Sequence, residues 1–145
     1  MEFLKNNPKW IRQPKQVQIS EDKVVILTER GTDLWARTYY GFQNDNAPVF
    51  QVETTDKYFS FIVKTEFEST CRFDQCGVAM YLNSDNWFKA SIEYENKKIQ
   101  RLGSVVTNHD ILTGQQQTYP LILKVCGIVF HEGTVTTVLN AVRMA

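Results

Sequence analysis

Residues suited to sugar binding alternate along two segments in the middle of the chain. In a β-strand every second side chain lies on the same face, so Trp87, Lys89, Ser91 and Glu93 share one face of the segment 87–94. Gln75 begins the preceding segment, on which Gly77, Ala79 and Tyr81 follow at the same spacing. Aromatic rings can cover the apolar faces of a sugar, while amides and charged groups hydrogen-bond its hydroxyls. This pattern indicates a carbohydrate-binding groove on one face of a sheet.

The same residues also fit a simpler interpretation. On a solvated sheet face, Lys89 and Glu93 would form a surface ion pair worth at most about 1 kcal/mol. The residue pattern by itself leaves both interpretations open.

Two neighbouring carboxylates, Glu93 and Glu95, indicate a second possible function, glycoside hydrolysis. Retaining glycosidases need two carboxyl groups on the same side, about 5 Å apart. Glu93 and Glu95 are two residues apart and would share a face, but Glu95 opens a turn at residues 95–98 and no third carboxylate follows. We therefore assign no catalytic residue and keep hydrolysis as an alternative.

Histidine and cysteine give no further chemistry. His109 and His131 stand alone, and neither lies in the setting of a Ser-His-Asp triad. Cys71, Cys76 and Cys126 form no Cys-x-x-Cys pair, so we predict no metal site and no cofactor. An odd number of cysteines without an export signal favours inert thiols in a reducing, cytoplasmic compartment.

The elements that would position these residues are strands. Residues 23–28, 58–67, 77–82, 87–94 and 99–107 are rich in β-branched and aromatic residues. In 58–67 one face is expected to carry Phe59, Phe61, Val63, Thr65 and Phe67. Turn clusters at 83–86 and 95–98 join the last three strands into an antiparallel meander. No stretch of 12 residues has a helical stripe, so the pattern predicts an all-β sandwich or barrel.

Length and composition exclude several classes of protein. The chain has 145 residues, of which 43% are hydrophobic, which suits one domain with a substantial core. Sixteen basic and sixteen acidic residues give a formal net charge of zero, so there is no electrostatic case for nucleic acid or an anionic membrane as partner. No run approaches the roughly 18 apolar residues of a membrane span.

Four blocks of sequence resemble a known family. Residues 31–42 read Gly-Thr-Asp-Leu-Trp-Ala-Arg-Thr-Tyr-Tyr-Gly-Phe. The middle of the likeness is carried by residues 73–81 and 85–94, and residues 101–108 continue it. The chain resembles the domain of unknown function 1349 family, a group that includes a fungal regulation-of-enolase protein. The resemblance implies a concanavalin A-like jelly-roll β-sandwich, and it suggests a protein partner such as a glycolytic enzyme. The activity of the family is largely undefined, and fold alone does not fix function.

The last quarter of the chain departs from the family pattern. After Asn108 and His109 the family continues Gly-Tyr-Ser-Asp-Trp, then Met-Trp-Tyr-Arg and Ser-Arg-Arg, whereas this chain reads Asp-Ile-Leu-Thr-Gly. Restoring one base before codon 110 allows all three family blocks to be read in order from synonymous codons. We therefore predict an incomplete sandwich domain over residues 1–109, lacking its C-terminal strands, and an out-of-frame tail over residues 110–145.

The sequence thus predicts a non-enzymatic carbohydrate-binding or regulatory module. Its candidate ligand-binding residues are Trp35, Arg37, Gln75, Trp87, Lys89 and Glu93. The two tryptophans would stack on the ligand and the other four would hydrogen-bond it, unless the tryptophans are core anchors and Arg37 holds a carboxylate or loop carbonyl. The alternatives are a glycan-cleaving enzyme that uses Glu93 and a protein-interaction regulator. The sequence does not predict the oligomeric state.

Overall fold

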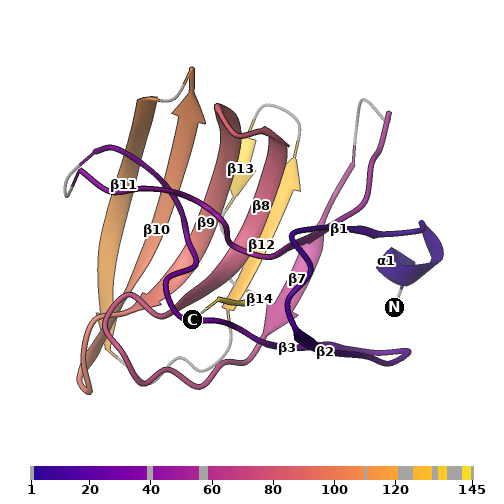
Figure 1. Cartoon of the computed structure of the whole chain (residues 1–145), viewed down its shortest axis with the longest axis horizontal. Helices are drawn as coiled ribbons and strands as arrows, with labels where there is room; N and C mark the ends of the chain where they lie inside the picture. Colours follow the sequence, from indigo (N-terminus) through magenta and orange to yellow (C-terminus); the bar gives the residue numbers. More distant parts are fainter. Residues whose placement is uncertain are drawn as a thin grey trace.

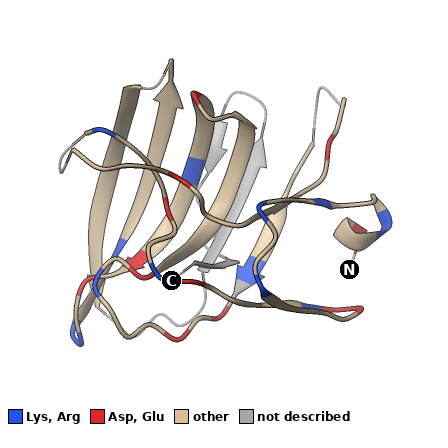
Figure 2. Ribbon diagram, viewed as in Figure 1, with Lys and Arg blue, Asp and Glu red and all other residues tan. Residues whose placement is uncertain are grey.

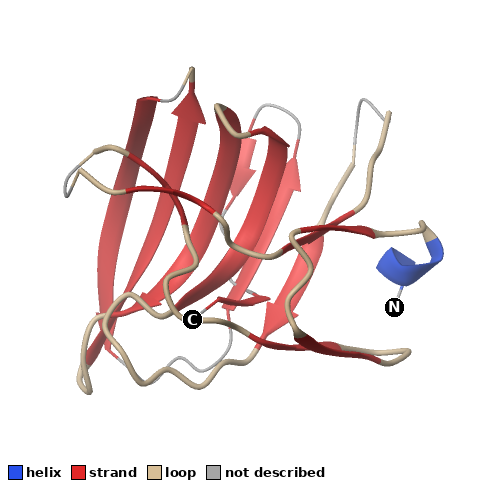
Figure 3. Cartoon of the chain, in the orientation of Figure 1, coloured by secondary structure: helices blue, strands red, loops and turns tan. Residues whose placement is uncertain are grey.

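The architecture is built almost entirely from strands (Figure 3). The computed structural model describes residues 2–38, 41–55, 59–109, 111–120, 126–131, 134–136 and 142–144. The elements in chain order are α1 (Glu2–Lys5), β1 (Lys9–Ile11), β2 (Gln16–Ile19), β3 (Val24–Leu27), β4 (Leu34–Ala36), β5 (Gln43–Asp45), β6 (Val49–Gln51), β7 (Ile62–Thr65), β8 (Gln75–Asn83), β9 (Asn86–Tyr94), β10 (Ile99–Asn108), β11 (Ile111–Pro120), β12 (Cys126–His131), β13 (Thr134–Thr136) and β14 (Val142–Met144). The all-β fold class predicted from the strand pattern is confirmed.

The strands form one large antiparallel sheet and several smaller ones. The large sheet has the order β11-β10-β9-β8-β14, and a three-stranded sheet has the order β13-β12-β7. The pairs β1–β6, β2–β3 and β4–β5 form small two-stranded sheets. In Figure 1 segments of the N-terminal part of the chain, coloured indigo to purple, cross in front of β9, β10 and β11. This arrangement fits an all-β sandwich.

The predicted meander forms the centre of the large sheet. β8 pairs with β9, and β9 pairs with β10, both antiparallel. The first turn is fixed by Asn83, whose side-chain Oδ1 accepts hydrogen bonds from the Asp85 amide at 3.0 Å and from the Asn86 side chain at 3.0 Å. In the second turn the Asn96 Oδ1 accepts from the amides of Lys98 and Ile99. Asparagine side chains thus replace missing backbone partners and set both reversals.

Strand alternation gives the large sheet two distinct faces. We call one the Lys89 face. From the register it carries Gln75, Gly77, Ala79 and Tyr81 of β8, Trp87, Lys89, Ser91 and Glu93 of β9, Arg101, Gly103, Val105 and Thr107 of β10, and Leu112, Gly114 and Gln116 of β11. The alternation expected for β8 and β9 is therefore correct.

The Lys89 face is covered in part by the N-terminal segments. A core cluster on this face joins Trp87, Val105 and Leu112 of the sheet to Leu34, Ala36, Ala47 and Val49 of the N-terminal segments. Burial of the apolar residues of β4 and β6 is favourable, and they pack on the apolar part of this face, formed by Trp87, Val105 and Leu112. Both faces of the sheet therefore bury side chains.

The opposite face, which we call the Ile92 face, packs against the segment around β7. Phe61 and Val63 contact the buried pair Val78 and Ala90, and Phe67 packs against Cys76 and Ile92. These three aromatic and aliphatic side chains belong to the face predicted for the segment 58–67; Tyr58 lies outside the described residues. Coverage of the Ile92 face is incomplete, since Met80 and Val106 remain 49% and 44% exposed.

The segment predicted to be out of frame contributes strands. Residues 111–120 form β11 and pair with β10 along their whole length, and β14 pairs with the outer edge of β8. A β-prone sequence can pair with an open edge whatever its reading frame, so these strands do not test that hypothesis. The division at residue 109 stays a prediction.

Candidate functional site

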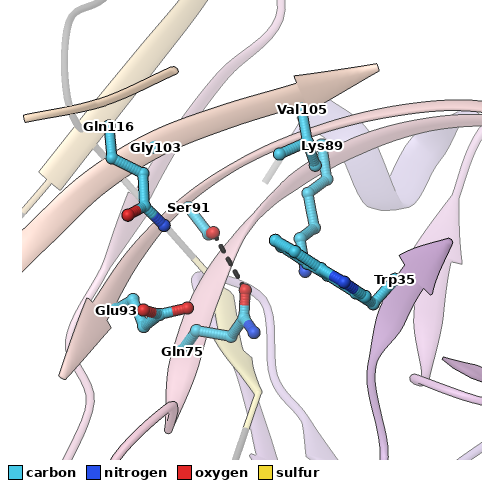
Figure 4. Close-up of a pocket in the computed structure, with 8 residues that line it drawn as sticks. All are labelled: Trp35, Gln75, Lys89, Ser91, Glu93, Gly103, Val105 and Gln116. Carbon is cyan, nitrogen blue, oxygen red and sulfur yellow. Dashed lines mark hydrogen bonds between the residues drawn. The ribbon is translucent and has the colours of Figure 1, made fainter. Parts of the chain in front are cut away.

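A polar pocket lies on the Lys89 face between the sheet and the crossing N-terminal segment (Figure 4). Its lining residues are Trp35, Gln75, Lys89, Ser91, Glu93, Gly103, Val105 and Gln116. In Figure 4 the polar ends of Gln75, Ser91, Glu93 and Gln116 point toward one another. The enclosed space is about 10 Å³, room for about one water molecule. A larger ligand must therefore displace part of the cover.

A buried ion pair forms one end of the pocket. The Lys89 Nζ lies 2.7 Å from the Asp33 Oδ1, and the Lys89 side chain is only 4% exposed. Gln75 and the backbone amide of Leu34 donate to the same Asp33 oxygen, at 3.2 and 2.7 Å. Desolvating an ammonium group is costly without such a partner, so Asp33 is what allows a lysine to lie under the cover.

Gln75 links this ion pair to the middle of the pocket. Its amide nitrogen donates to Asp33, while its Oε1 accepts a hydrogen bond from the Ser91 hydroxyl at 3.0 Å. Both side chains are buried, and Gln75 lies directly across from Glu93 in the β8–β9 register. The chain of hydrogen bonds fixes the orientation of the Gln75 amide and presents an ordered polar wall.

Glu93 is the acidic group of the pocket. Burial raises the pKa of Glu93 above its ordinary value; the charges of Asp33 and Glu95 raise it further, while Lys89 and Arg101 oppose the shift. Among the described residues, none donates a hydrogen bond to the Glu93 carboxyl group. A carboxyl in this state can donate when protonated and accept when ionised.

Trp35 forms the cover. Its ring lies over the Lys89 amine, with 5.6 Å between the Lys89 Nζ and the ring centroid, which is within cation–π range. The Trp35 indole Nε1 donates to the backbone carbonyl of Thr38 at 2.7 Å, which fixes the orientation of the ring. An aromatic ring is thus held against the polar wall.

The pocket contains four of the six residues predicted from the sequence. These four are Trp35, Gln75, Lys89 and Glu93. Trp87 is on the same sheet face but is only 4% exposed inside the core cluster, so its ring has no free face for a ligand. Arg37 is exposed beyond the end of β4, where its Nε donates to the Gln43 Oε1 at 3.2 Å. For these two residues the geometry fits structural roles.

Sequence reasoning missed Asp33 and Gln116 as site residues. Asp33 is 56 residues from Lys89 along the chain, and Gln116 lies in the segment taken as out of frame. The available signal for Asp33 was its place two residues before Trp35 in the block that resembles the family. Nothing in its spacing to Lys89 indicated an ion pair.

Glu95, the other carboxylate considered for glycoside hydrolysis, belongs to a second charged cluster. Glu95 lies 2.9 Å from the Arg72 Nε and 3.1 Å from the Arg101 Nε, and it is 13% exposed. It is held between two guanidinium groups beyond the end of β9, outside the pocket lining. Glu93 and Glu95 therefore do not face one cavity as a glycosidase pair would.

The described residues offer no other chemistry of the kinds considered. Among them, no three His, Cys, Asp or Glu side chains lie together as metal ligands would. No helix in that part of the chain has the length and apolar character needed to cross a membrane.

Comparison with known proteins places the chain in a family. Residues 10–115 match the model of the family described as protein of unknown function, DUF1349. The chain belongs to this family. The match includes β4, which carries Trp35, together with the whole of β8, β9 and β10, and it therefore takes in most of the pocket of this DUF1349 member.

Two relatives from Saccharomyces cerevisiae are similar to the chain. Regulation of enolase protein 1 is 34% identical over 100 residues, which are 68% of this chain and 49% of that protein. The chain thus matches about half the length of this curated relative. A crystal structure of a functionally unknown yeast protein is 24% identical and has a TM-score of 0.75, covering 95% of this chain and 80% of that one. This second likeness supports the fold.

Proposed function

We propose that this DUF1349 member is a non-enzymatic binding module whose site is the polar pocket on the Lys89 face. One observation carries the proposal: Glu93 lines the polar pocket as a half-buried carboxyl group with a raised pKa, and no described residue donates a hydrogen bond to it. A half-buried carboxyl group without a donor from the described chain is available to hydrogen-bond a hydroxyl group of a ligand.

The surrounding groups favour a polyhydroxy ligand of the carbohydrate class. Gln75, Ser91 and Gln116 offer neutral donors and acceptors around Glu93, and Trp35 offers a flat apolar ring. Sugars present both kinds of surface, hydroxyl edges and apolar faces. Because the space holds about one water, we expect a sugar to displace the Trp35 ring, which breaks the indole hydrogen bond to the Thr38 carbonyl and exposes the wall.

Glycan cleavage is the second candidate, because a raised carboxyl pKa is typical of a general acid. The geometry favours it less. A retaining or inverting mechanism needs a second carboxylate across the scissile bond, and no other carboxylate lines the pocket among the described residues. The neighbouring Asp33 Oδ1 already accepts from Lys89, Gln75 and the Leu34 amide.

A protein-interaction role is the third candidate. Its support is the name of the yeast relative, Regulation of enolase protein 1, which is 34% identical to this chain over 100 residues. This candidate predicts capture of enolase by the chain, independent of the polar pocket.

The test is a glycan array probed with the purified chain, followed by calorimetric titration of the best-bound glycan. We expect Glu93→Gln to weaken binding about 10-fold or more, since hydrogen bonds to charged groups contribute about 1.5–3 kcal/mol. Glu53→Gln is the matched control, because Glu53 is a carboxylate with a side chain 80% exposed, and it should bind as the wild type does.

The outcomes separate the three candidates. Weakened binding without any turnover of the glycan supports the module. Turnover by the wild type that Glu93→Gln abolishes, with binding retained, supports hydrolysis instead. Absence of any glycan ligand together with co-purification of enolase overturns the carbohydrate proposal in favour of protein interaction.

A further inference from the structure

The outer edge of the large sheet is formed by β11, a strand of ten residues. β11 pairs with β10 at every position from Ile111 to Pro120. Within the described part of the chain no strand pairs with its other side. In an antiparallel ladder alternate residues direct their N–H and C=O groups to opposite sides, so about five residues of β11 leave these groups unpaired outward.

β11 lacks the features that normally protect such an edge. Proteins commonly place lysine, other charged residues, proline or a bulge on long edge strands to prevent pairing with another chain. Residues 111–120 contain no charged side chain, and the only proline is the last residue, Pro120. Figure 2 shows β11 free of acidic and basic colouring, whereas the inner strand β9 carries both. Its pairing with β10 is continuous, without a register shift.

The composition of β11 suits pairing with itself. When two copies pair antiparallel about a two-fold axis, side chains near the axis meet their own symmetry mates, so any charge there would face a like charge. Gln115, Gln116 and Gln117 occupy the centre of β11, with Thr113 and Thr118 beside them. Amide side chains both donate and accept hydrogen bonds, so a glutamine can pair with a second glutamine. The zero net charge of the chain adds no repulsion between copies.

The opposite edge of the sheet differs. The outer side of β8 is paired with β14 at Gln75, Cys76 and Gly77. Beyond Gly77 no described strand pairs with the outer side of β8, but this stretch is shorter than β11. β11 is therefore the longest unpaired edge of this sheet among the described residues, and its occupation by a second copy closes it. We propose that β11 is a self-association edge, at which two copies of this chain join antiparallel into one continuous sheet with the Lys89 faces on the same side.

This proposal does not depend on the proposed ligand or on the reading frame. It follows from the length, pairing and side-chain chemistry of β11 as the chain now reads. It predicts a closed dimer, because each copy uses its single β11 edge once.

The test compares two double variants with the same added charge. Gln115→Lys/Gln117→Lys places two ammonium groups on exposed positions of β11, and Gln16→Lys/Gln18→Lys places two on exposed positions of β2 with the same spacing. Sedimentation velocity at micromolar concentrations should show a dimer for the wild type and the β2 variant. The β11 variant should be monomeric, with dimer affinity reduced at least 10-fold.

Two further measurements keep the outcome decisive. Circular dichroism must show that the β11 variant retains the wild-type β-sheet spectrum and a cooperative melt, which separates loss of pairing from loss of folding. In the wild type, amide hydrogen exchange of residues 111–120 should slow as protein concentration rises. A wild-type monomer, a dimer unaffected by the β11 charges, or open-ended polymers in place of a dimer would each overturn the proposal.

Discussion

At the scale of the residue, the buried pair of Lys89 and Asp33 defines the site. Lys89 is almost completely buried, and its amine is 2.7 Å from the Asp33 oxygen. Removing one partner of such a pair commonly costs about 3–5 kcal/mol, because the other charge stays buried and unpaired. Because Asp33 belongs to the N-terminal segment, the geometry of the pocket depends on where this segment crosses the sheet.

Glu93 gives a pH-dependent prediction at the same scale. Its folded pKa is raised mainly by burial, so between the ordinary glutamate value near 4.3 and the raised value the folded chain binds more protons than the unfolded chain. The stability contributed by the protonated group is fully present below about 4.3 and is lost as pH rises through the folded pKa.

Glu93→Gln should remove the loss of stability that accompanies ionisation of Glu93 at rising pH. We expect the free energy of unfolding of the variant, relative to the wild type, to increase from pH 4 to pH 7, with a slope of at most about 1.4 kcal/mol per pH unit. Urea unfolding at several pH values measures this difference. Glu53→Gln, at an exposed carboxylate, is the control and should show a much flatter difference. A Glu93→Gln difference that is flat or falls with pH would contradict the assignment.

At the scale of the element, two glycines let the central strands come together around Ser91. Gly77 of β8 and Gly103 of β10 both lie opposite Ser91 in the register. A Cβ on Gly77 would overlap the backbone carbonyl oxygen of Ala90 and come within 2.7 Å of the Ser91 Cβ. A Cβ on Gly103 would meet the Gln116 Cγ, part of a flexible side chain, at 3.1 Å and the Gln115 backbone carbonyl oxygen at 3.3 Å, a milder crowding than at Gly77.

Gly77→Ala should therefore destabilise the fold more than Gly103→Ala. We expect Gly77→Ala to cost about 1–3 kcal/mol, because a backbone group must shift, and Gly103→Ala to cost less than about 1 kcal/mol. Thermal and urea unfolding of the two variants measure the costs, with Gly103→Ala as the matched glycine control. Equal losses of stability in the two variants would contradict the prediction that Gly77 is required for the close contact between β8 and β9.

A polar network fixes the N-terminal segment to the sheet at the same scale. The Arg12 Nε donates to the Ala47 carbonyl at 2.8 Å, and the Arg12 guanidinium lies 3.1 Å from Asp45. The Tyr81 hydroxyl of β8 donates to Asp45 at 2.9 Å, and Ser84 donates at 2.6 Å. These bonds join the residue after β1 to β5 and to the end of β8, and β5 pairs with β4, which carries Trp35.

At the scale of the whole molecule, an uncovered apolar surface accompanies the departure from the family pattern. Ile111 is 66% exposed and Val106 is 44% exposed on the Ile92 face, where the second layer of a sandwich would bury them. The family match ends at residue 115. This match continues past residue 109, so the out-of-frame tail over residues 110–145 stays a prediction.

The coding DNA provides the direct test. We expect one inserted base before codon 110 to restore Gly-Tyr-Ser-Asp-Trp after His109, followed by Met-Trp-Tyr-Arg further on. A protein expressed from the restored frame should melt at a higher temperature than the present chain, because apolar area on the Ile92 face would be buried. Codons that cannot be read in this way after one insertion refute the proposal.

Features of the fold and the site that depend on neighbouring residues in the chain could be predicted from the sequence, whereas those that depend on contacts between distant segments could not. Asparagine turns and two-residue alternation act locally, so they predicted the β8–β10 meander and the shared face of Gln75, Lys89 and Glu93. Family blocks predicted the relationship that the comparisons show. Alternation also places Trp87 on that face, yet it does not say what lies above it.

Only the tertiary structure decided which part of the Lys89 face is core and which is pocket. The apolar side chains of β4 and β6 pack over Trp87, while Asp33 reaches Lys89 across 56 residues of sequence and carries Trp35 with it. These contacts depend on where a segment distant in sequence crosses the sheet. The spacing of residues within one strand does not predict that crossing. The sequence by itself therefore determined the strands and the polar row, and the packing of the N-terminal segment turned that row into a covered pocket.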